Sequence, residues 1–591
     1  MSTSPESSPK TLSGLLFHAR DVSGGQASLL ELYRDGTRES LSTTDFLRQV
    51  HALAVALEAS GVVAGERIAL YSENRPEWHV VDFACHLLAA PTVPISPSTP
   101  ADHVAFVLRN SGARWVFYSG SSKRQTLRQI ASGLANPPRM VALDGEAAMP
   151  DSPGLTQLLG VGTGRLGEVP IERFRDRAAA EDLATLLYTS GTTGDPKGVM
   201  LSHANLISNV MACSRVFDIG PTDLAVSFLP LAQIFQRTVD YLCFLRGTAI
   251  CYVPNPDELG DALRAATPTL MAAAPRVYER AHQRLLADID ALPTWRRRLF
   301  TWAQSIGRRY ADASRDGFIG PLLALQNVLA HRLVHRRVQD RFGGRLRLAI
   351  SGGAPLPEDV AAFFDAAGMP LYQGYGLTET SPVLATNTPE QHRLGSVGKP
   401  LSDVELRIAE DGEILVRGPG VMQGYWQNPG ATAETVSESG WLRTGDLGRM
   451  DKSGYVFITD RKKDLIVLSS GENIAPRPIE VQLTQGGLIE QAVVLGDGRP
   501  HTVALLVPGE RLRTLAAGAD GPVHEDPAVL ERVQEMVDAV NERLTRASRI
   551  RAWTLLERAL SVDEGELTPT LKIRRRVVAQ RYARQIANLY S

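Results

Sequence analysis

The chain is poor in lysine and cysteine, and both shortages narrow what the protein can be. Of 63 basic residues in a chain of 591, only eight are lysine, at positions 10, 123, 197, 399, 452, 462, 463 and 572. The four cysteines form no CxxC pair and no cluster with histidine. We therefore expect them to be small buried apolar residues of a cytosolic protein, not disulfides or zinc ligands.

The sequence also lacks a long apolar run and an excess of charge of one sign. No run of about 18 apolar residues occurs, so no membrane-spanning helix is expected. The start, MSTSPESSPK, has no apolar core of a signal peptide, and residues 1–10 are predicted to form a disordered tail. A formal net charge of −2 argues against a nucleic-acid partner. A cytoplasmic location is expected.

What the sequence does contain is an alternation of helical and strand-like segments. Between residues 45 and 120, the helical patterns FLRQVHALAVALEASG and PEWHVVDFACHLLAA alternate with the strand-like runs ERIALYS, TVPISP and RWVFYSG. This alternation predicts α/β layers with largely parallel strands. After residue 400, short strands with Asp-Gly and Ser-Gly turns predict a small β-rich part. A further α/β unit, with a helix at 527–547, closes the chain. Because 591 residues exceed a single core, we expect two or more domains.

The first motif with chemical content is YTSGTTGDPKGVMLSHANL, residues 188–206. Between Ser190 and Gly198 it packs three glycines, three hydroxyl residues and Lys197. Glycines let backbone amides approach an anion, and hydroxyls with a lysine complete a cradle for phosphate oxygens. The alternative is a flexible surface loop, since such clusters are common in loops.

The second motif, LYQGYGLTETSP at 371–382, places Tyr375 between Gly374 and Gly376, so that its ring can face a base. Thr378 and Glu379 follow, and the carboxylate is a hard oxygen ligand suited to Mg²⁺. The alternative is a strand-to-helix turn capped by Thr378.

The third motif, WLRTGDLG at 441–448, puts Asp446 in a tight turn, where its carboxylate could hold two ribose hydroxyls or simply form an Asx-turn. The fourth, TDRKKDLIVLSSGENIAPRPIE at 459–480, contains the basic run Arg461, Lys462 and Lys463 near its start. This basic run is either functional or a solvated linker.

In this order and spacing the four motifs resemble the adenylate-forming superfamily of acyl-CoA synthetases, peptide-synthetase adenylation domains and firefly-type luciferases. The resemblance covers roughly residues 10 to 585 and is closest to bacterial long-chain fatty acyl-CoA ligases. Supporting stretches are GERIALYSENRPEW, PRVYER, RLAISGGAPL and LSSGENIAPRPIE. It implies a large N-terminal AMP-binding domain of several subdomains at 11–460 and a hinge at 461–463. It also implies a smaller, mobile α+β C-terminal domain at 464–591 that carries the catalytic lysine.

The resemblance also implies the reaction and its participants. A fatty acid reacts with ATP, assisted by Mg²⁺, to give an acyl-adenylate and pyrophosphate, and coenzyme A then displaces AMP. The implied catalytic residues are Lys572, Thr378 and Glu379, with Glu379 and Thr189 at the metal and Lys463 at the hinge. The implied ATP/AMP-binding residues are Thr189, Ser190, Gly191, Thr192, Thr193, Gly194, Lys197, Gly353, Ala354, Gly374, Tyr375, Gly376, Asp446 and Arg461. The implied acyl and coenzyme A channel contains Gln233, Gly471 and Glu472.

One stretch departs from the family pattern. Long-chain members have LPLAH followed by two residues and an acid, whereas this chain has LPLAQIFQR at 229–237, with Gln233 in place of histidine. Glutamine can donate and accept hydrogen bonds but cannot become positively charged. Gln233 therefore either alters efficiency or substrate choice, or acts as a neutral isostere.

A basic helical stretch at 276–347 carries 15 arginines against six acidic residues. Within it, Trp295, Leu299, Trp302 and Ile306 share a helical face. A basic amphipathic helix can lie on the inner face of an anionic membrane, and the alternative is a surface helix packing those side chains into the core. The resemblance allows a homodimer. Arg574–Arg576, next to Lys572, are predicted to be a solvated basic run.

Three functions stay open at this point. The first is an ATP-dependent fatty acyl-CoA ligase, which the stretch SSGENIAP favours. The second is a fatty acyl-AMP ligase that delivers to a carrier protein. The third is a non-catalytic nucleotide-binding regulator, suggested by Gln233 and opposed by the set Lys197, Glu379, Asp446 and Lys572.

Overall fold

The computed structural model describes residues 8–23, 28–144, 153–189, 196–315, 317–515, 522–561, 564–567 and 573–590. The chain divides into two compact units, which are described separately below. The first unit contains residues 1–406 and 416–442, and the second contains residues 407–415 and 443–591. Residues 1–7 of the predicted tail lie outside the described residues, as do Lys572 and the loop residues Ser190, Gly191, Thr192, Thr193 and Gly194.

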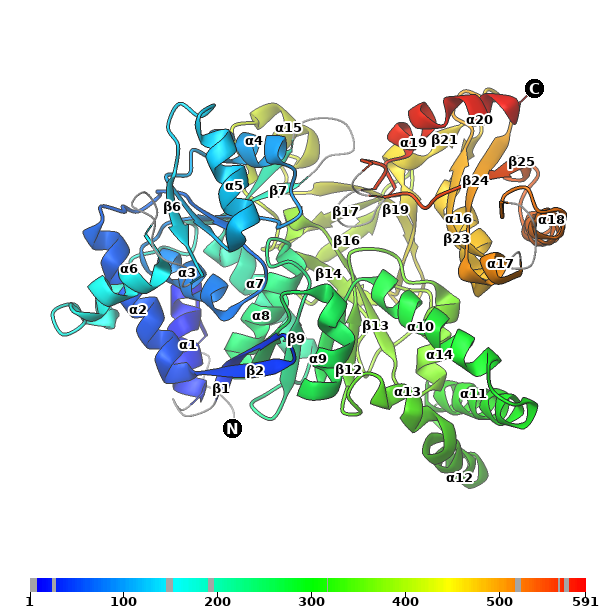
Figure 1. Ribbon diagram of the computed structural model, residues 1–591, viewed down its shortest axis with the longest axis horizontal. Coiled ribbons are helices and arrows are strands. Elements are labelled where there is room, and N and C mark those ends of the chain that lie inside the picture. The colour runs from blue at the N-terminus through cyan, green and yellow to red at the C-terminus, as the bar shows by residue number, and fades with distance from the viewer. Residues whose placement is uncertain are drawn as a thin grey trace. The chain divides into compact units, whose positions relative to one another are not determined.

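The first unit contains two large sheets (Figure 1). Within the described residues, one sheet has nine strands, in the order β15 (Lys399–Pro400), β14 (Val383–Thr386), β13 (Leu371–Gly376), β12 (Leu348–Ser351), β11 (Leu270–Ala273), β9 (Leu224–Ser227), β10 (Ala249–Tyr252), β1 (Ser28–Arg34) and β2 (Thr37–Ser42). The pairs from β13 through β12, β11, β9 and β10 to β1 are parallel, and the pairs at both edges are antiparallel.

The described part of the other sheet has seven strands, in the order β18 (Gly424–Tyr425), β8 (Lys197–Ser202), β7 (Leu183–Thr189), β4 (Thr92–Ile95), β3 (Ile68–Tyr71), β5 (Trp115–Tyr118) and β6 (Arg139–Ala142). The strands from β7 to β6 pair in parallel, whereas β8 and β18 are antiparallel additions at one edge. This edge carries the motif at 188–206, which we call the phosphate-loop motif because it is predicted to bind phosphate oxygens. Parallel strands buried on both faces explain the continuous apolar runs in the sequence.

The helices follow the strands along the chain, as expected for α/β layers. Those of the first unit are α1 (Leu12–Ser23), α2 (Thr43–Ala59), α3 (Pro76–Leu87), α4 (Ala101–Ser111), α5 (Gly120–Ala131), α6 (Leu155–Thr163), α7 (His203–Val216), α8 (Ile234–Arg246), α9 (Leu259–Ala266), α10 (Pro275–Asp290), α11 (Thr294–Arg315), α12 (Pro321–Ala330), the π-helical segment η4 (His331–His335), α13 (Arg336–Asp340), α14 (Glu358–Ala366) and α15 (Pro429–Thr435). Among the described residues, no helix has the length and apolar composition needed to cross a bilayer.

A buried polar network connects α8 to both large sheets. The Arg237 guanidinium donates to Asp82 of α3, to Thr92 of β4 and to Thr185 of β7. One turn further along α8, Asp240 accepts hydrogen bonds from Ser227 of β9 and Gln236, and it contacts His79 at 3.1 Å. Arg237, Asp82 and Asp240 are all fully buried, so the charges stabilise the fold only because they are paired and hydrogen-bonded.

Neighbouring charges shift the pKa values in this network. Although burial works against a charged carboxylate, Arg237 and His86 hold the pKa of Asp82 well below its usual range. Burial also opposes charging of His79, but Asp240 and Asp82 raise its pKa above its ordinary value. Asp82 is thus paired with Arg237, and His79 lies near both carboxylates.

The second unit contains smaller sheets. Its β-rich part is a sheet with the described order β16 (Glu405–Ile408), β17 (Glu413–Arg417), β19 (Leu442–Met450) and β20 (Val456–Arg461), and β16 and β17 straddle the division between the units. A short pair, β21 (Ile466–Val467) and β22 (Asn473–Ile474), leads to the sheet of β23 (Ile489–Leu495), β24 (Thr502–Pro508) and β25 (Ile550–Leu555). Its helices are α16 (Pro476–Thr484), α17 (Glu510–Leu515), α18 (Pro527–Asn541), α19 (Arg575–Arg581) and α20 (Ala583–Asn588).

Most elements predicted from the sequence are present, and one helix boundary was wrong. The helix predicted at 527–547 ends at Asn541. The Asn541 side chain donates to the carbonyl of Ile550 and accepts from its amide, which holds the start of β25. The four cysteines are buried and free, as predicted.

The network yields a stability prediction. Asp82→Asn leaves Arg237 buried without its counter-charge, so we expect the unfolding free energy of the first unit to fall by about 3–5 kcal/mol. Denaturant unfolding measures the loss. The matched control is Arg48→Gln, which removes the exposed Arg48–Asp45 pair and should change stability by less than about 1 kcal/mol. Equal losses in the two variants would contradict the assigned importance of the network.

Candidate active site

The phosphate-loop motif is anchored by the hairpin of β7 and β8. Thr189 ends β7 and lies opposite Lys197, the first residue of β8, in the antiparallel register. Thr189 and Lys197, which flank the loop, therefore lie next to each other. A Cβ at Gly198 would be in tight contact, about 3.2–3.3 Å from the side chains of Tyr188 and Trp426, so these side chains would have to shift slightly to admit one.

Lys197 and Glu379 meet at the side chain of Tyr425. The Lys197 ammonium lies 4.9 Å from the centroid of the Tyr425 ring, and the Tyr425 hydroxyl donates to Glu379 Oε1 at 2.9 Å. Burial, and then the Glu379 carboxylate, raise the pKa of Tyr425 well above its usual value, so the hydroxyl stays protonated and donates. One tyrosine thus holds the predicted phosphate lysine and the predicted metal carboxylate close together.

Glu379 is fixed from its backbone as well. It lies in the 3-10 turn η5 (Thr378–Thr380), and its carbonyl accepts from the amide of Met422 at 2.9 Å. The strand before it, β13, ends at Gly376, where a Cβ would come within 1.8 Å of the Pro382 carbonyl oxygen. Only glycine fits at 376, and this close approach sets the direction in which Thr378 and Glu379 leave the sheet.

Tyr375 is half-buried on β13 and pairs with Ala385 of β14. The glycine before it behaves differently from Gly376. A Cβ at Gly374 would be in ordinary contact, 3.5 Å from the Thr386 hydroxyl. Packing therefore demands glycine at 376 and tolerates a side chain at 374.

Gly353 and Ala354 follow the carboxyl end of β12, the edge where ligands bind in open α/β sheets. Gly353 has a φ of +80°, which favours glycine, and a Cβ there would have no neighbouring atom within 4 Å. At the preceding Gly352, a Cβ would come within 2.9 Å of the Phe235 ring of α8. Gly352 thus lies directly against the helix that begins after Gln233, whereas the space beside Gly353 is open.

Gln233 is the N-cap residue of α8, and its side chain makes no capping hydrogen bond. Its side chain is half-buried. Gln236 differs, because it is fully buried and donates to Asp240 within the polar network. The same helix reaches the loop after η5, where Thr238 Oγ1 lies 3.5 Å from the Ser381 carbonyl oxygen.

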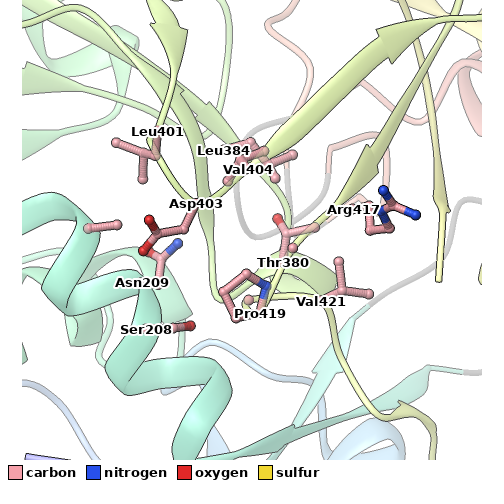
Figure 2. Close-up of a pocket in the computed structure, with 13 residues that line it drawn as sticks. Ser208, Asn209, Thr380, Leu384, Leu401, Asp403, Val404, Arg417, Pro419 and Val421 are labelled. Carbon is pink, nitrogen blue, oxygen red and sulfur yellow. The ribbon is translucent and has the colours of Figure 1, made fainter.

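A small pocket lies behind η5 (Figure 2). Its polar lining is already engaged: Asn209 donates to the Val383 carbonyl and accepts from its amide, while Asp403 pairs with Arg215. Thr380, on the η5 side, donates to the Pro382 carbonyl. The pocket therefore supports η5 structurally.

In the second unit, the predicted ribose-binding pair is assembled across two strands. Asp446 of β19 lies opposite Arg461 of β20, and Arg461 Nε donates to Asp446 Oδ1 at 2.9 Å. Asp446 is buried. The tight turn predicted at Asp446 was wrong, because Gly445 and Asp446 lie within β19. Gly445 has a φ of +69° and donates its amide to Glu413 Oε1. A carboxylate has lone pairs for further donors, so this pairing leaves Asp446 able to accept hydroxyl groups.

The two lysines of the basic run, Lys462 and Lys463, have different surroundings. Lys462 donates to Asp411 at 2.7 Å and to Glu413 at 2.9 Å. Lys463 is exposed, and among the described residues it has no ion-pair partner. Gly471, with a φ of +85°, and Glu472 form the exposed turn between β21 and β22.

The segment that carries Lys572 is anchored at both ends. Leu567 and Ile573 form an isolated antiparallel bridge, and the amide of Arg574 donates to the Glu566 carbonyl. The prediction of a solvated run at Arg574–Arg576 was wrong for Arg575, which donates to Glu480 at 2.5 and 3.2 Å and to the Val494 carbonyl. Arg575 therefore fixes α19, immediately after the predicted catalytic lysine, to the unit's core.

The side chains present suit Mg²⁺. Glu379 offers a half-exposed carboxylate held in place by Tyr425, and Thr189 offers a hydroxyl. Among the described residues there is no cluster of three or more His, Cys, Asp or Glu side chains. Mg²⁺ in nucleotide sites is bound by one or two carboxylates, water and substrate phosphates, so a single carboxylate fits this ion.

Sequence reasoning missed Tyr425 and Trp426. Tyr425 pairs with Val199 of β8, and Trp426 donates its amide to the Gly198 carbonyl and its indole N–H to the Asn110 carbonyl. The available signal was the stretch QGYWQNP, a glycine followed by two aromatic residues. It carries no charged group, and only the pairing of β18 with β8 brings it to the phosphate loop.

Three features of the chain are typical of adenylate-forming enzymes. They are a glycine-rich loop followed by a lysine, a strand that leads to Tyr375 and Glu379, and the cross-strand pair Asp446–Arg461. The model of the family "AMP-binding enzyme" matches residues 23–426, and that of "AMP-binding enzyme C-terminal domain" matches residues 463–591. The chain belongs to the AMP-binding enzyme family. This confirms the superfamily predicted from the four motifs.

Relatives with curated names cover most of the chain. Long-chain-fatty-acid–CoA ligase FadD15 of Mycobacterium bovis is 34% identical over 573 residues, covering 94% of this chain and 93% of that one. Long-chain-fatty-acid–CoA ligase 1 of Homo sapiens is 31% identical over 559 residues, covering 89% and 78%. ATP-bound MatB from Rhodopseudomonas palustris has the same fold, with a TM-score of 0.72, 23% identity and coverage of 96% and 99%. The predicted α/β fold class is confirmed.

The site geometry predicts the effect of losing one hydroxyl group. Tyr425→Phe keeps the ring beside Lys197 but removes the hydrogen bond to Glu379. A hydrogen bond to a charged group contributes about 1.5–3 kcal/mol, so we expect kcat/KM for pyrophosphate release to fall about 10- to 100-fold and the Mg²⁺ requirement to rise. Rates across a Mg²⁺ titration measure both effects.

The control for this variant is Tyr278→Phe, which removes a buried hydroxyl that donates to the Ile350 carbonyl. It should keep the wild-type Mg²⁺ dependence. A Tyr425→Phe enzyme with wild-type kcat/KM and Mg²⁺ dependence would show that Tyr425 does not position Glu379.

Proposed function

We propose that the protein is an ATP-dependent ligase that converts a long-chain fatty acid to its acyl-CoA by way of an acyl-adenylate. The observation that carries the proposal is the cluster of Lys197, Tyr425 and Glu379 beside the phosphate-loop hairpin. The names of the full-length relatives support the acid and the thioester product.

The chemistry explains why this cluster is needed. A carboxylate must attack the α-phosphorus of an anionic nucleotide, and the like charges repel. Preorganised donors and cations that meet the charge developing in the transition state each contribute roughly 3–4 kcal/mol. We assign Lys197 and the loop amides to the β- and γ-phosphates, Thr378 to the α-phosphate and Lys572 to the attacking carboxylate and α-phosphate.

Recognition of the nucleoside is assigned residue by residue. In the first unit, Tyr375 stacks on the adenine, which Gly353 and Ala354 line, and the absence of a Cβ at Gly374 leaves room for the base. In the second unit, Asp446 accepts the ribose hydroxyls, and Arg461 holds the Asp446 carboxylate in position through its cross-strand bond. Gly471 and Glu472 are assigned to the coenzyme A channel, and Lys463 to the hinge.

We include Mg²⁺ as the resident metal, held by Glu379 and by the hydroxyl of Thr189. When bound, it supplies Lewis-acid neutralisation of phosphate charge. Tyr425 serves this ion indirectly, since its hydroxyl orients the Glu379 carboxylate.

The test is acid-dependent pyrophosphate release across a series of fatty acids of increasing length, with and without coenzyme A. We expect the highest kcat/KM with long chains and stoichiometric acyl-CoA when coenzyme A is present. Pyrophosphate release without thioester formation would instead indicate delivery to a carrier protein. No release with any acid would indicate a regulatory protein and contradict the proposal.

The position of Gln233 gives a pH prediction. Glutamine does not titrate, whereas Gln233→His introduces a group that becomes cationic below about pH 6.5. Beside the attacking carboxylate, that charge should raise the ratio of variant to wild-type kcat/KM by about fivefold from pH 8 to pH 5.5, the factor that roughly 1 kcal/mol corresponds to. Gln129→His on the exposed side of α5 is the control and should give a flat ratio. A flat ratio for Gln233→His would show that residue 233 does not face the substrate.

A further inference from the structure

The helix α12 exposes apolar side chains that nothing in its own unit covers. Five of them form what we call the α12 stripe: Leu322, Leu325, Val328, Leu329 and Leu333. Each has between 45% and 69% of its surface exposed. Their spacings of three, three, one and four residues place them on one side of the helical run that α12 and η4 form.

The opposite side of the same run is occupied. Ala330 and Val334 pack with Ala303 and Ile306 of α11, and Leu299 and Trp302 lie against this small core. The stripe that the sequence placed on α11 is therefore largely internal, because α12 covers it. Since α12 has apolar residues on both sides, burying one side leaves the other in water.

Two aromatic side chains on the neighbouring segments are also exposed. Phe318, just before α12, is 77% exposed, and Trp295, at the start of α11, is 62% exposed. Contiguous apolar surface of this kind on a folded protein marks a site of interaction with a partner or a membrane. Figure 1 shows α12 at the margin of the first unit beside α11.

The charges around the stripe select the partner. Residues 317–339 contain no aspartate or glutamate. Arg332, Arg336 and Arg337 continue the helical run and are exposed, as are Arg296–Arg298 on α11. A two-fold contact with a second copy would bring this acid-free, arginine-rich segment against itself, and like charges would repel. An anionic surface offers the opposite charge and an apolar interior together.

We propose that the α12 stripe docks the protein onto an anionic phospholipid bilayer. With ten residues, α12 is about 15 Å long, which is too short to span a bilayer, so it lies in the plane of the interface with its leucines among the acyl chains. The arginines contact the phosphate groups of the lipids, and Trp295 and Phe318 sit at the level of the headgroups. The inference goes beyond the ligase activity, which it does not assume.

The test is co-sedimentation of the full chain with vesicles, without substrates, so its outcome is independent of the proposed reaction. Phosphatidylcholine vesicles are compared with mixed phosphatidylcholine and phosphatidylglycerol vesicles at roughly 0.05 M and 0.5 M salt. We expect binding to the anionic vesicles at low salt, and a large decrease at high salt. Binding that does not depend on anionic lipid, or no binding at all, overturns the proposal.

Two variants localise the contact. Leu325→Glu with Leu329→Glu puts charge into the stripe and should abolish vesicle binding. The matched control is Val63→Glu with Val161→Glu, two residues of the same unit that are 59% and 55% exposed on other elements, and it should bind like the wild type. Arg332→Gln with Arg336→Gln should weaken low-salt binding about 25-fold, since each arginine near an anionic surface contributes about a factor of five.

Circular dichroism and denaturant unfolding check that each variant is folded, and the exposed arginine pair keeps the test valid if the glutamate pair fails to fold. Wild-type vesicle binding by the glutamate pair would overturn the proposal. A different result would also overturn the proposal: light scattering shows that the wild type is a dimer and the glutamate pair is a monomer, and neither protein binds vesicles. The stripe would then be an interface between copies.

Discussion

The buried ion pair of Asp82 and Arg237 is the interaction on which the first unit depends. It joins α3 to α8 and, through Thr92 and Thr185, attaches α8 to the seven-stranded sheet, while Asp240 attaches the same helix to β9 of the nine-stranded sheet. Charges so deeply buried are tolerated only as a complete, matched set. The consequence for function is local: a helix fixed to both sheets has Gln233 as its N-cap residue and holds Phe235 against Gly352, just after β12.

Features of the fold and the site that depend on residues close together in the sequence could be predicted. Features that depend on contacts between distant segments could not. The α/β layers follow from short-range periodicity, whereas Asp446, predicted to lie in a tight turn, is a strand residue of β19. The Asp446–Arg461 pair was predicted as two ribose residues, and strand pairing brings them together. Tyr425 was missed because its importance comes from a contact between segments more than 200 residues apart in the chain, β18 and β8.

Errors about charge and exposure had a common physical cause. Arg575 was predicted to be solvated because it lies in a run of arginines, but Glu480 is positioned to pair with it from a different helix. In the basic helical stretch, the aromatic face of α11 was visible in the sequence, whereas the helix that covers it was not. Periodicity identifies an apolar side of a helix, but which apolar side meets the core depends on tertiary packing.

The central claim is that the acid is activated on the nucleotide before any thiol takes part. Exchange of labelled pyrophosphate into ATP tests it most directly, because exchange requires reversible formation of the acyl-adenylate. The account predicts exchange that depends on fatty acid and Mg²⁺ and proceeds in the complete absence of coenzyme A. Exchange that requires coenzyme A, or none with any fatty acid at concentrations that support turnover, would contradict it.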